Sequence, residues 1–161
     1  MSELPSTKSP VQNGVSPQEI RESTRVRLAL ILTVVGFIVF IIGTKPEWFN
    51  LDRSPVVGFV QIAVFLIGLA IIAIGGYMGL NALWGTTERT IIADIGQRLI
   101  ATGYVIVVFS GMADVFGMGS QPRPDIPYFG PIQAVGVAIG EFVIAVGFLM
   151  LVPYHKHTSL S

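Results

Sequence analysis

The sequence contains no cysteine, only two histidines and few charged residues. The absence of thiols excludes disulfides, thiolate metal sites and a cysteine nucleophile. His155 and His157 both follow the last apolar segment, so we expect no buried axial ligand for a haem, and no cofactor or metal. Charged residues make up 12% of the chain, against about 25% in soluble domains. The formal net charge of +0 argues against a nucleic-acid partner.

What the chain has instead is long apolar runs, with 52% hydrophobic residues and a mean hydropathy of +0.69. A helix needs about 20 apolar residues to cross a bilayer. Four segments approach or exceed this length, at about 26–43, 56–83, 99–118 and 131–153. The sequence therefore predicts an all-α integral membrane protein with four transmembrane helices, multi-pass in the cell membrane, with the lipid bilayer as its main partner.

Prolines mark most of the helix boundaries. Pro17, Pro55 and Pro131 each suit the first position of a helix, where the missing N–H costs nothing, and Pro153 suits a helix end. The first of these signals predicts a helix that starts well before the membrane and runs to about residue 43. The segment 85–98 places isoleucines at helical spacing, which predicts an amphipathic stretch at the membrane surface that leads into the third span.

The remaining segments set the domain organisation and the orientation. Residues 1–15 are expected to be a disordered cytoplasmic tail and residues 154–161 a polar cytoplasmic tail, on either side of a transmembrane domain of residues 16–153. Most lysines and arginines lie before the first span, between the second and third spans, and after the fourth. The positive-inside rule then predicts two antiparallel hairpins with both termini in the cytoplasm. A cleaved signal peptide is the competing interpretation of the first span, but no small-residue cleavage site follows it.

The fourth span carries one acid in its middle. Glu141 is the only charged residue between positions 131 and 153. An ionised side chain at this depth costs several kcal/mol, so we expect Glu141 to face other helices or water and to be uncharged unless a partner compensates it. It is either a structural acid that hydrogen-bonds a neighbouring helix or a functional group.

Each of the other spans has polar residues in its outer half. At a rise of about 1.5 Å per residue, these side chains lie roughly 6 to 15 Å from the outer helix ends. They are Thr33, Gln61, Ser110 and Asp114. If the faces that carry them converge, they form a hydrated path from the outer surface to Glu141. If they do not, Asp114 is an ordinary acid near a helix end.

Small residues predict where the fourth helix packs. Ala134, Ala138 and Ala145 share one helical face with Glu141, while Gly136 and Gly140 form a GxxxG pattern on a neighbouring face. Small faces let helix backbones approach closely in membranes. We therefore expect these residues to form close contacts, within the bundle or between copies of the chain.

The sequence has no phosphate-binding glycine loop after a strand, no HExxH and no GxSxG. We therefore expect a protein that is not an enzyme. The favoured interpretation is an accessory or structural subunit that packs against other membrane proteins or against a second copy of itself. The alternative is a proton- or ion-coupled transport unit that uses Glu141.

Overall fold

The computed structural model describes residues 17–50, 58–85, 88–118 and 129–154. Within these ranges the chain is all-helical, as predicted, and contains no strand. The elements are α1 (Pro17–Thr44), the short 3-10 helix η1 (Pro46–Phe49), α2 (Phe59–Leu83), α3 (Ile91–Gly111) and α4 (Pro131–Leu151). The four α-helices are each long and apolar enough to cross a membrane. The predicted tail 1–15, most of the tail 154–161 and the helix start at Pro55 lie outside the described residues.

The ends of α4 follow from its sequence. Pro131 occupies the first helical position, and the Gly130 N–H donates to the Gln133 Oε1 atom at 2.7 Å. The helix ends at Leu151, because Val152 adopts an extended conformation with ψ of 128°. Extended backbone is the preference of a residue that precedes proline, here Pro153.

The third helix is displaced from the span predicted at 99–118. It begins at Ile91, after Thr90, whose hydroxyl accepts a hydrogen bond from the Ala93 N–H at 3.3 Å. This cap turns part of the predicted surface segment 85–98 into the first turns of the helix. After Gly111 the chain continues in turns, and Gly117 has a φ of 76°, which glycine adopts without steric cost.

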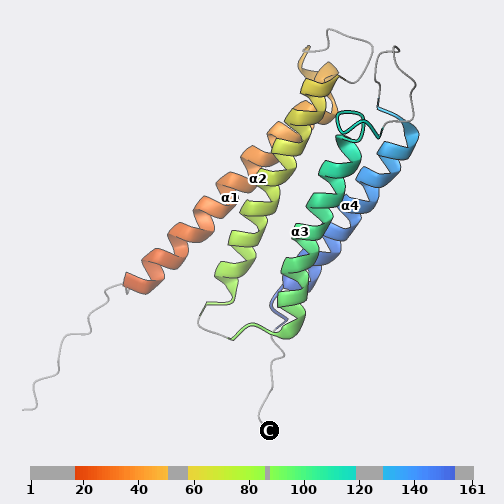
Figure 1. Cartoon of the computed structure of the whole chain (residues 1–161). Coiled ribbons are helices and arrows are strands. Elements are labelled where there is room, and N and C mark those ends of the chain that lie inside the picture. Colours follow the sequence, from red (N-terminus) through yellow and green to blue (C-terminus); the bar gives the residue numbers. More distant parts are fainter. Residues whose placement is uncertain (1–16, 51–57, 86–87, 119–128, 155–161) are drawn as a thin grey trace, which may run out of the picture.

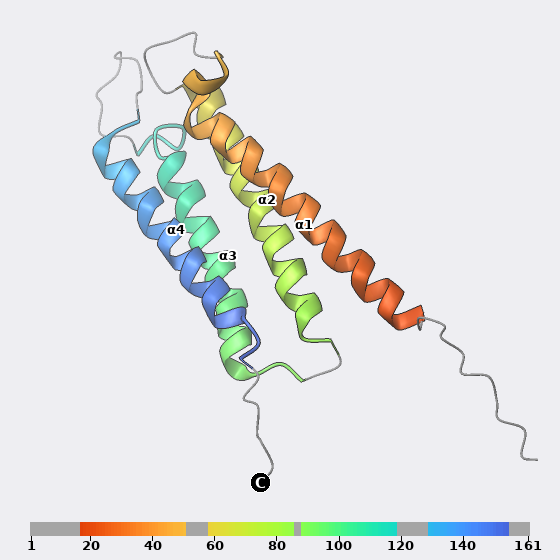
Figure 2. The same ribbon diagram turned by 180° about the vertical axis from the view of Figure 1, so that it is seen from behind.

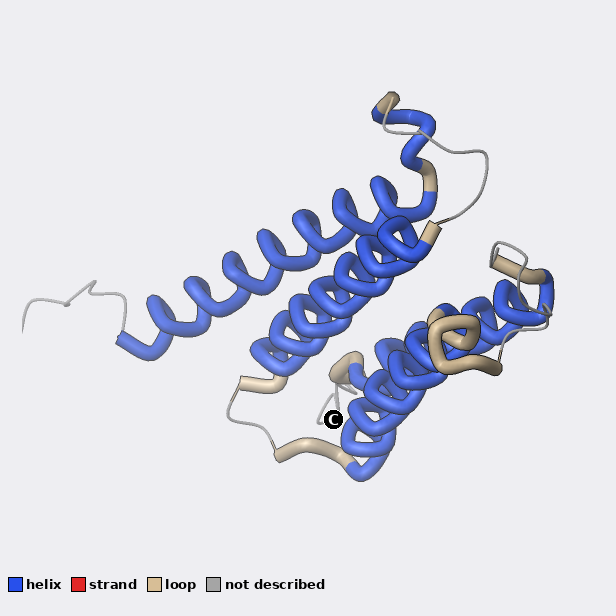
Figure 3. The backbone as a smooth tube through the Cα atoms, turned by 45° about the horizontal axis from the view of Figure 1, so that its top comes forward, coloured by secondary structure: helices blue, strands red, loops and turns tan. Residues whose placement is uncertain are grey.

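The four helices form two pairs that lie next to each other. Helix α1 runs beside α2, and α3 runs beside α4, in views from both sides (Figures 1 and 2). Figure 3 separates the pairs more clearly. The start of α1, the end of α2, the start of α3 and the end of α4 lie at one end of the molecule, which we call the Trp84 end. We call the opposite end the Phe129 end.

Glycines bring the backbones of α3 and α4 into direct contact. A Cβ atom added at Gly103 would lie 2.7 Å from the Gly140 carbonyl oxygen, and one added at Gly140 would lie 2.8 Å from the Gly103 oxygen. Gly96 and Gly147 meet in the same way one heptad further along, at 2.6 and 2.7 Å. Any side chain at these four positions would force the helices apart.

The α1–α2 pair also uses glycines seven residues apart, but here each glycine meets a larger residue. Gly43 lies against Phe65, and Gly68 lies against Phe40. The two phenylalanine rings pack together with their centroids 4.9 Å apart. The atoms nearest to an added Cβ at Gly43 and Gly68 include the backbone N and Cα atoms of these phenylalanines, so the backbones of α1 and α2 also approach closely.

Two side chains, one buried and one half-buried, join the two pairs to each other. The Trp84 indole N–H, at the end of α2, donates to the Leu151 carbonyl oxygen at the end of α4, at 3.0 Å. The Tyr104 hydroxyl on α3 donates to the Leu66 carbonyl oxygen on α2, at 3.3 Å. Trp84 is only 7% exposed. These two bonds hold α2 against α3 and α4.

Candidate functional site

A cavity of about 460 Å³ lies between the two helix pairs, and its lining contains Glu141. Residues of all four helices contribute to it, together with Phe129, which gives the Phe129 end its name. The lining consists of Phe40, Thr44, Ile62, Phe65, Gly111, Phe129, Ala134, Val137, Ala138 and Glu141. Thr44 and Phe129 lie near the helix ends, whereas Glu141 lies in the middle of α4. The cavity, which we call the Glu141 cavity, thus extends from the Phe129 end toward mid-helix.

Glu141 is half-buried and has no partner in the part of the chain that the structure describes: no hydrogen bond or ion pair joins it to another residue there. Apart from Glu141, the only polar side chain of the lining is Thr44, whose hydroxyl donates to the Phe40 carbonyl oxygen of its own helix at 2.8 Å. The carboxyl group of Glu141 therefore stands unpaired in surroundings that are otherwise apolar.

The other polar residues predicted to accompany Glu141 do not line the cavity. The Thr33 hydroxyl donates to the Ala29 carbonyl oxygen at 2.9 Å and lies in the α1–α2 contact. Ser110 lies against Gly136 in the α3–α4 contact. Gln61 is half-buried on α2, and Asp114 is half-buried in the turns after α3, beyond the helix that was expected to carry it.

The small residues predicted for packing divide between two surfaces of α4. Gly140 is buried in the α3–α4 contact, and Gly136 lies beside it. Ala134 and Ala138 are exposed and line the Glu141 cavity, while Ala145 is exposed and lies outside the lining. The alanine face thus surrounds the acid rather than contacting α3, which leaves that face open to another molecule.

Sequence reasoning missed a second unpaired polar group. Gln133 is 8% exposed, and its Oε1 atom accepts the Gly130 N–H, but its Nε2 atom has no partner among the described residues. The spacing of Gly130 and Gln133 is that of a capping interaction, which was visible in the sequence. A buried amide without a partner costs about 1–3 kcal/mol, so this donor is available to water or to a bound group.

No metal centre emerges from the ranges that the structure covers, where no three residues among histidine, aspartate and glutamate come together to hold an ion. The chemistry that this arrangement offers is therefore that of one carboxyl group in an apolar cavity. Such a group can accept or donate a hydrogen bond, or exchange a proton.

Comparison of the chain with protein-family models, with curated proteins and with solved structures found no match. Four helices long and apolar enough to cross a membrane, packed as two glycine-mediated pairs, are compatible with a small multi-pass membrane protein.

Proposed function

We propose that this chain is a non-enzymatic accessory or structural subunit of a membrane assembly, in which an apolar helix of another chain packs over the Glu141 cavity. The single observation that carries the proposal is an unpaired carboxyl group in an apolar cavity that a neighbouring helix can cover. A partner residue that hydrogen-bonds Glu141 would remove the cost of leaving that group unpaired in the membrane. The partner is another membrane protein or a second copy of this chain.

The proposal includes an orientation. We propose that the two helix pairs are two antiparallel hairpins in the cell membrane, with both termini in the cytoplasm. The distribution of basic residues supports this orientation. Among the described residues, Lys45 is the one basic residue at the Phe129 end, whereas the Trp84 end has five arginines: Arg21, Arg25, Arg27, Arg89 and Arg98. An excess of basic residues favours the cytoplasmic side. The Glu141 cavity then faces the outer half of the membrane.

Filling the cavity should prevent assembly without unfolding the chain. We expect Ala138→Phe to shift the protein from a larger assembly to the size of the free chain in mild detergent extracts of its own membranes. The matched control is Val135→Phe on the same helix, because Val135 is 60% exposed and does not line the cavity. Blue native electrophoresis gives the size, and circular dichroism checks the helix content. Equal sizes for Ala138→Phe and Val135→Phe would contradict the proposal.

A second function is favoured by one observation, which is that the cavity leads from the Phe129 end to Glu141. We propose as the alternative a proton- or ion-coupled transport unit in which Glu141 exchanges a proton through this cavity. The apolar lining supports it less well than assembly, because proton transfer needs a chain of water or polar groups.

Proteoliposomes that contain only this chain test the alternative. If Glu141 conducts, an imposed pH gradient should produce a proton flux that Glu141→Gln abolishes, because the amide cannot release a proton. Asp114→Asn is the matched control, since Asp114 does not line the cavity and its loss should leave the flux unchanged. A flux of the unmodified chain no larger than that of empty liposomes rejects the transport function.

A further inference from the structure

At the Trp84 end, the guanidinium group of Arg89 is held in place by neutral groups. Its Nη1 atom donates to the Gln97 Oε1 atom at 3.2 Å and to the Tyr77 hydroxyl at 3.5 Å, and its Nη2 atom donates to the Asn81 Oδ1 atom. The guanidinium also lies 5.9 Å from the centre of the Tyr77 ring. No carboxylate forms an ion pair with Arg89 within the described ranges. The group is therefore fixed in position while its charge remains uncompensated.

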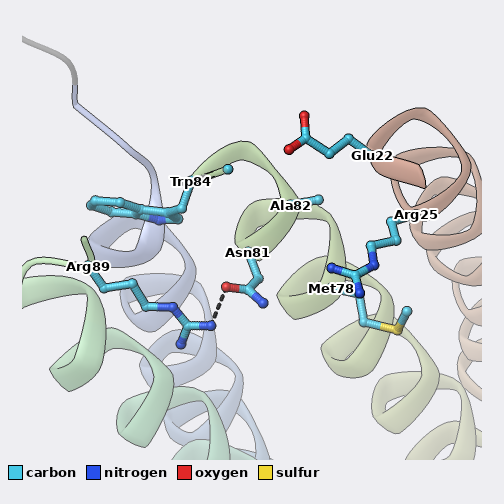
Figure 4. Close-up of a pocket in the computed structure, with 8 residues that line it drawn as sticks. Glu22, Arg25, Met78, Asn81, Ala82, Trp84 and Arg89 are labelled. Carbon is cyan, nitrogen blue, oxygen red and sulfur yellow. Dashed lines mark hydrogen bonds between the residues drawn. The ribbon is translucent and has the colours of Figure 1, made fainter. Parts of the chain in front are cut away.

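Arg89 lines a cavity of about 500 Å³ with a second arginine (Figure 4). Arg25 of α1 approaches from the opposite side of the α2 end, and Asn81 lies between the two arginines. Glu22 is the one acidic residue of the lining. Two guanidinium groups against one carboxylate leave a net positive site, which is the complement of a phosphate.

The same arginine borders an apolar groove between α2 and α3. Tyr77 and Gln97, which accept hydrogen bonds from Arg89, both line this groove of about 340 Å³. The other lining residues are Ala70, Ala73, Ile74, Ile100, Ala101 and Tyr104. The Tyr104 hydroxyl is already bonded to the Leu66 carbonyl oxygen, so it offers no free donor to a polar ligand. A basic site and an apolar groove thus meet at Tyr77 and Gln97.

We propose that this site binds an anionic phospholipid, with its phosphate at Arg89 and Arg25 and one acyl chain in the α2–α3 groove. The charge complementarity selects an anion, and the adjoining groove selects one that carries an apolar chain. The position also fits, because Arg25 lies just before the apolar part of α1 and Arg89 lies between the end of α2 and the start of α3, at the level of lipid headgroups. A bound lipid would fill the space between the two helix pairs at the Trp84 end.

Titration of the full-length chain in non-ionic detergent, followed by native mass spectrometry, tests the site. Phosphatidylglycerol should bind at least about tenfold more tightly than phosphatidylcholine with the same acyl chains, as expected for a hydrogen-bonded charge. Arg89→Gln should remove this preference. Arg98→Gln is the matched control, because Arg98 is exposed, belongs to the same end and lines neither cavity. Equal binding of the two lipids, or an equal loss in both variants, overturns the proposal.

The groove is tested without touching the arginines. Ala101 is exposed on α3, and Ala101→Phe should fill the groove and weaken phosphatidylglycerol binding about tenfold. If Arg89→Gln does not fold, Ala101→Phe still tests whether the site binds the lipid. Soluble glycerol phosphate should bind far more weakly than phosphatidylglycerol. If it binds equally well, or if Ala101→Phe has no effect, the site takes a free phosphate and the lipid proposal is rejected.

Discussion

Replacing Gly140 with leucine should destabilise the protein by about 3 kcal/mol, because there is no space for a side chain between α3 and α4. Even the Cβ atom would lie 2.6 Å from the Val107 Cγ2 atom and 2.8 Å from the Gly103 carbonyl oxygen. Backbone atoms of a packed helix cannot move away singly, so the two helices must separate along their length. Thermal unfolding in mild detergent, followed by circular dichroism, should show a clear drop in the midpoint.

A matched pair of alanine variants separates packing from helix propensity. Alanine is favoured over glycine within a helix by about 1 kcal/mol at either site. At Gly79 of α2, an added Cβ would meet only the Ala29 Cβ atom, at 3.4 Å, so Gly79→Ala should be neutral or stabilising. Gly140→Ala should be destabilising. If the two variants unfold at the same temperature, Gly140 does not hold the α3–α4 contact.

Replacing Glu141 with leucine should stabilise the isolated chain by about 1–3 kcal/mol, which is the cost of an unpaired polar group in apolar surroundings. A structural acid that hydrogen-bonds a neighbouring helix, which the sequence left open, would give the opposite result, because leucine would leave its partner unpaired. No such partner occurs in the described part of the chain. Glu141→Gln should change stability little, since the amide is also unpaired.

Denaturant unfolding of the purified chain measures both Glu141 variants. Ala145→Leu on the same helix is the control for added apolar surface, because Ala145 is exposed and its replacement removes no polar group. It should change the free energy of unfolding by less than about 0.5 kcal/mol. A Glu141→Leu variant that is less stable than the unmodified chain would mean that the acid already has a partner or water within the isolated chain.

The helices could be predicted because their signals are local. Pro17 and Pro131 begin α1 and α4 where the sequence indicated, and the apolar length of each segment is a property of the chain itself. The third helix begins at Ile91, inside the segment expected as an amphipathic lead-in to the third span, because the Thr90 hydroxyl caps it there. Local capping chemistry, rather than hydrophobicity, set that boundary.

The candidate site was predictable only in part. Ala134, Ala138 and Glu141 share a face by helical spacing alone, and all three line the cavity. Which residues of other helices join them depends on how the helices rotate against each other. That rotation is set by glycines spaced seven residues apart in every helix. It places Thr33 in the α1–α2 contact and Ser110 in the α3–α4 contact. The spacing is present in the sequence at 36/43, 68/75, 96/103 and 140/147.

Occupation of the Glu141 cavity by another chain is the central claim, and photo-crosslinking in native membranes tests it most directly. A photo-reactive amino acid at position 138 lies in the cavity lining, and the same group at position 135 lies on an exposed face of α4. We expect a protein adduct of defined mass from position 138 and only lipid adducts from position 135. Lipid adducts alone from both positions would contradict the claim.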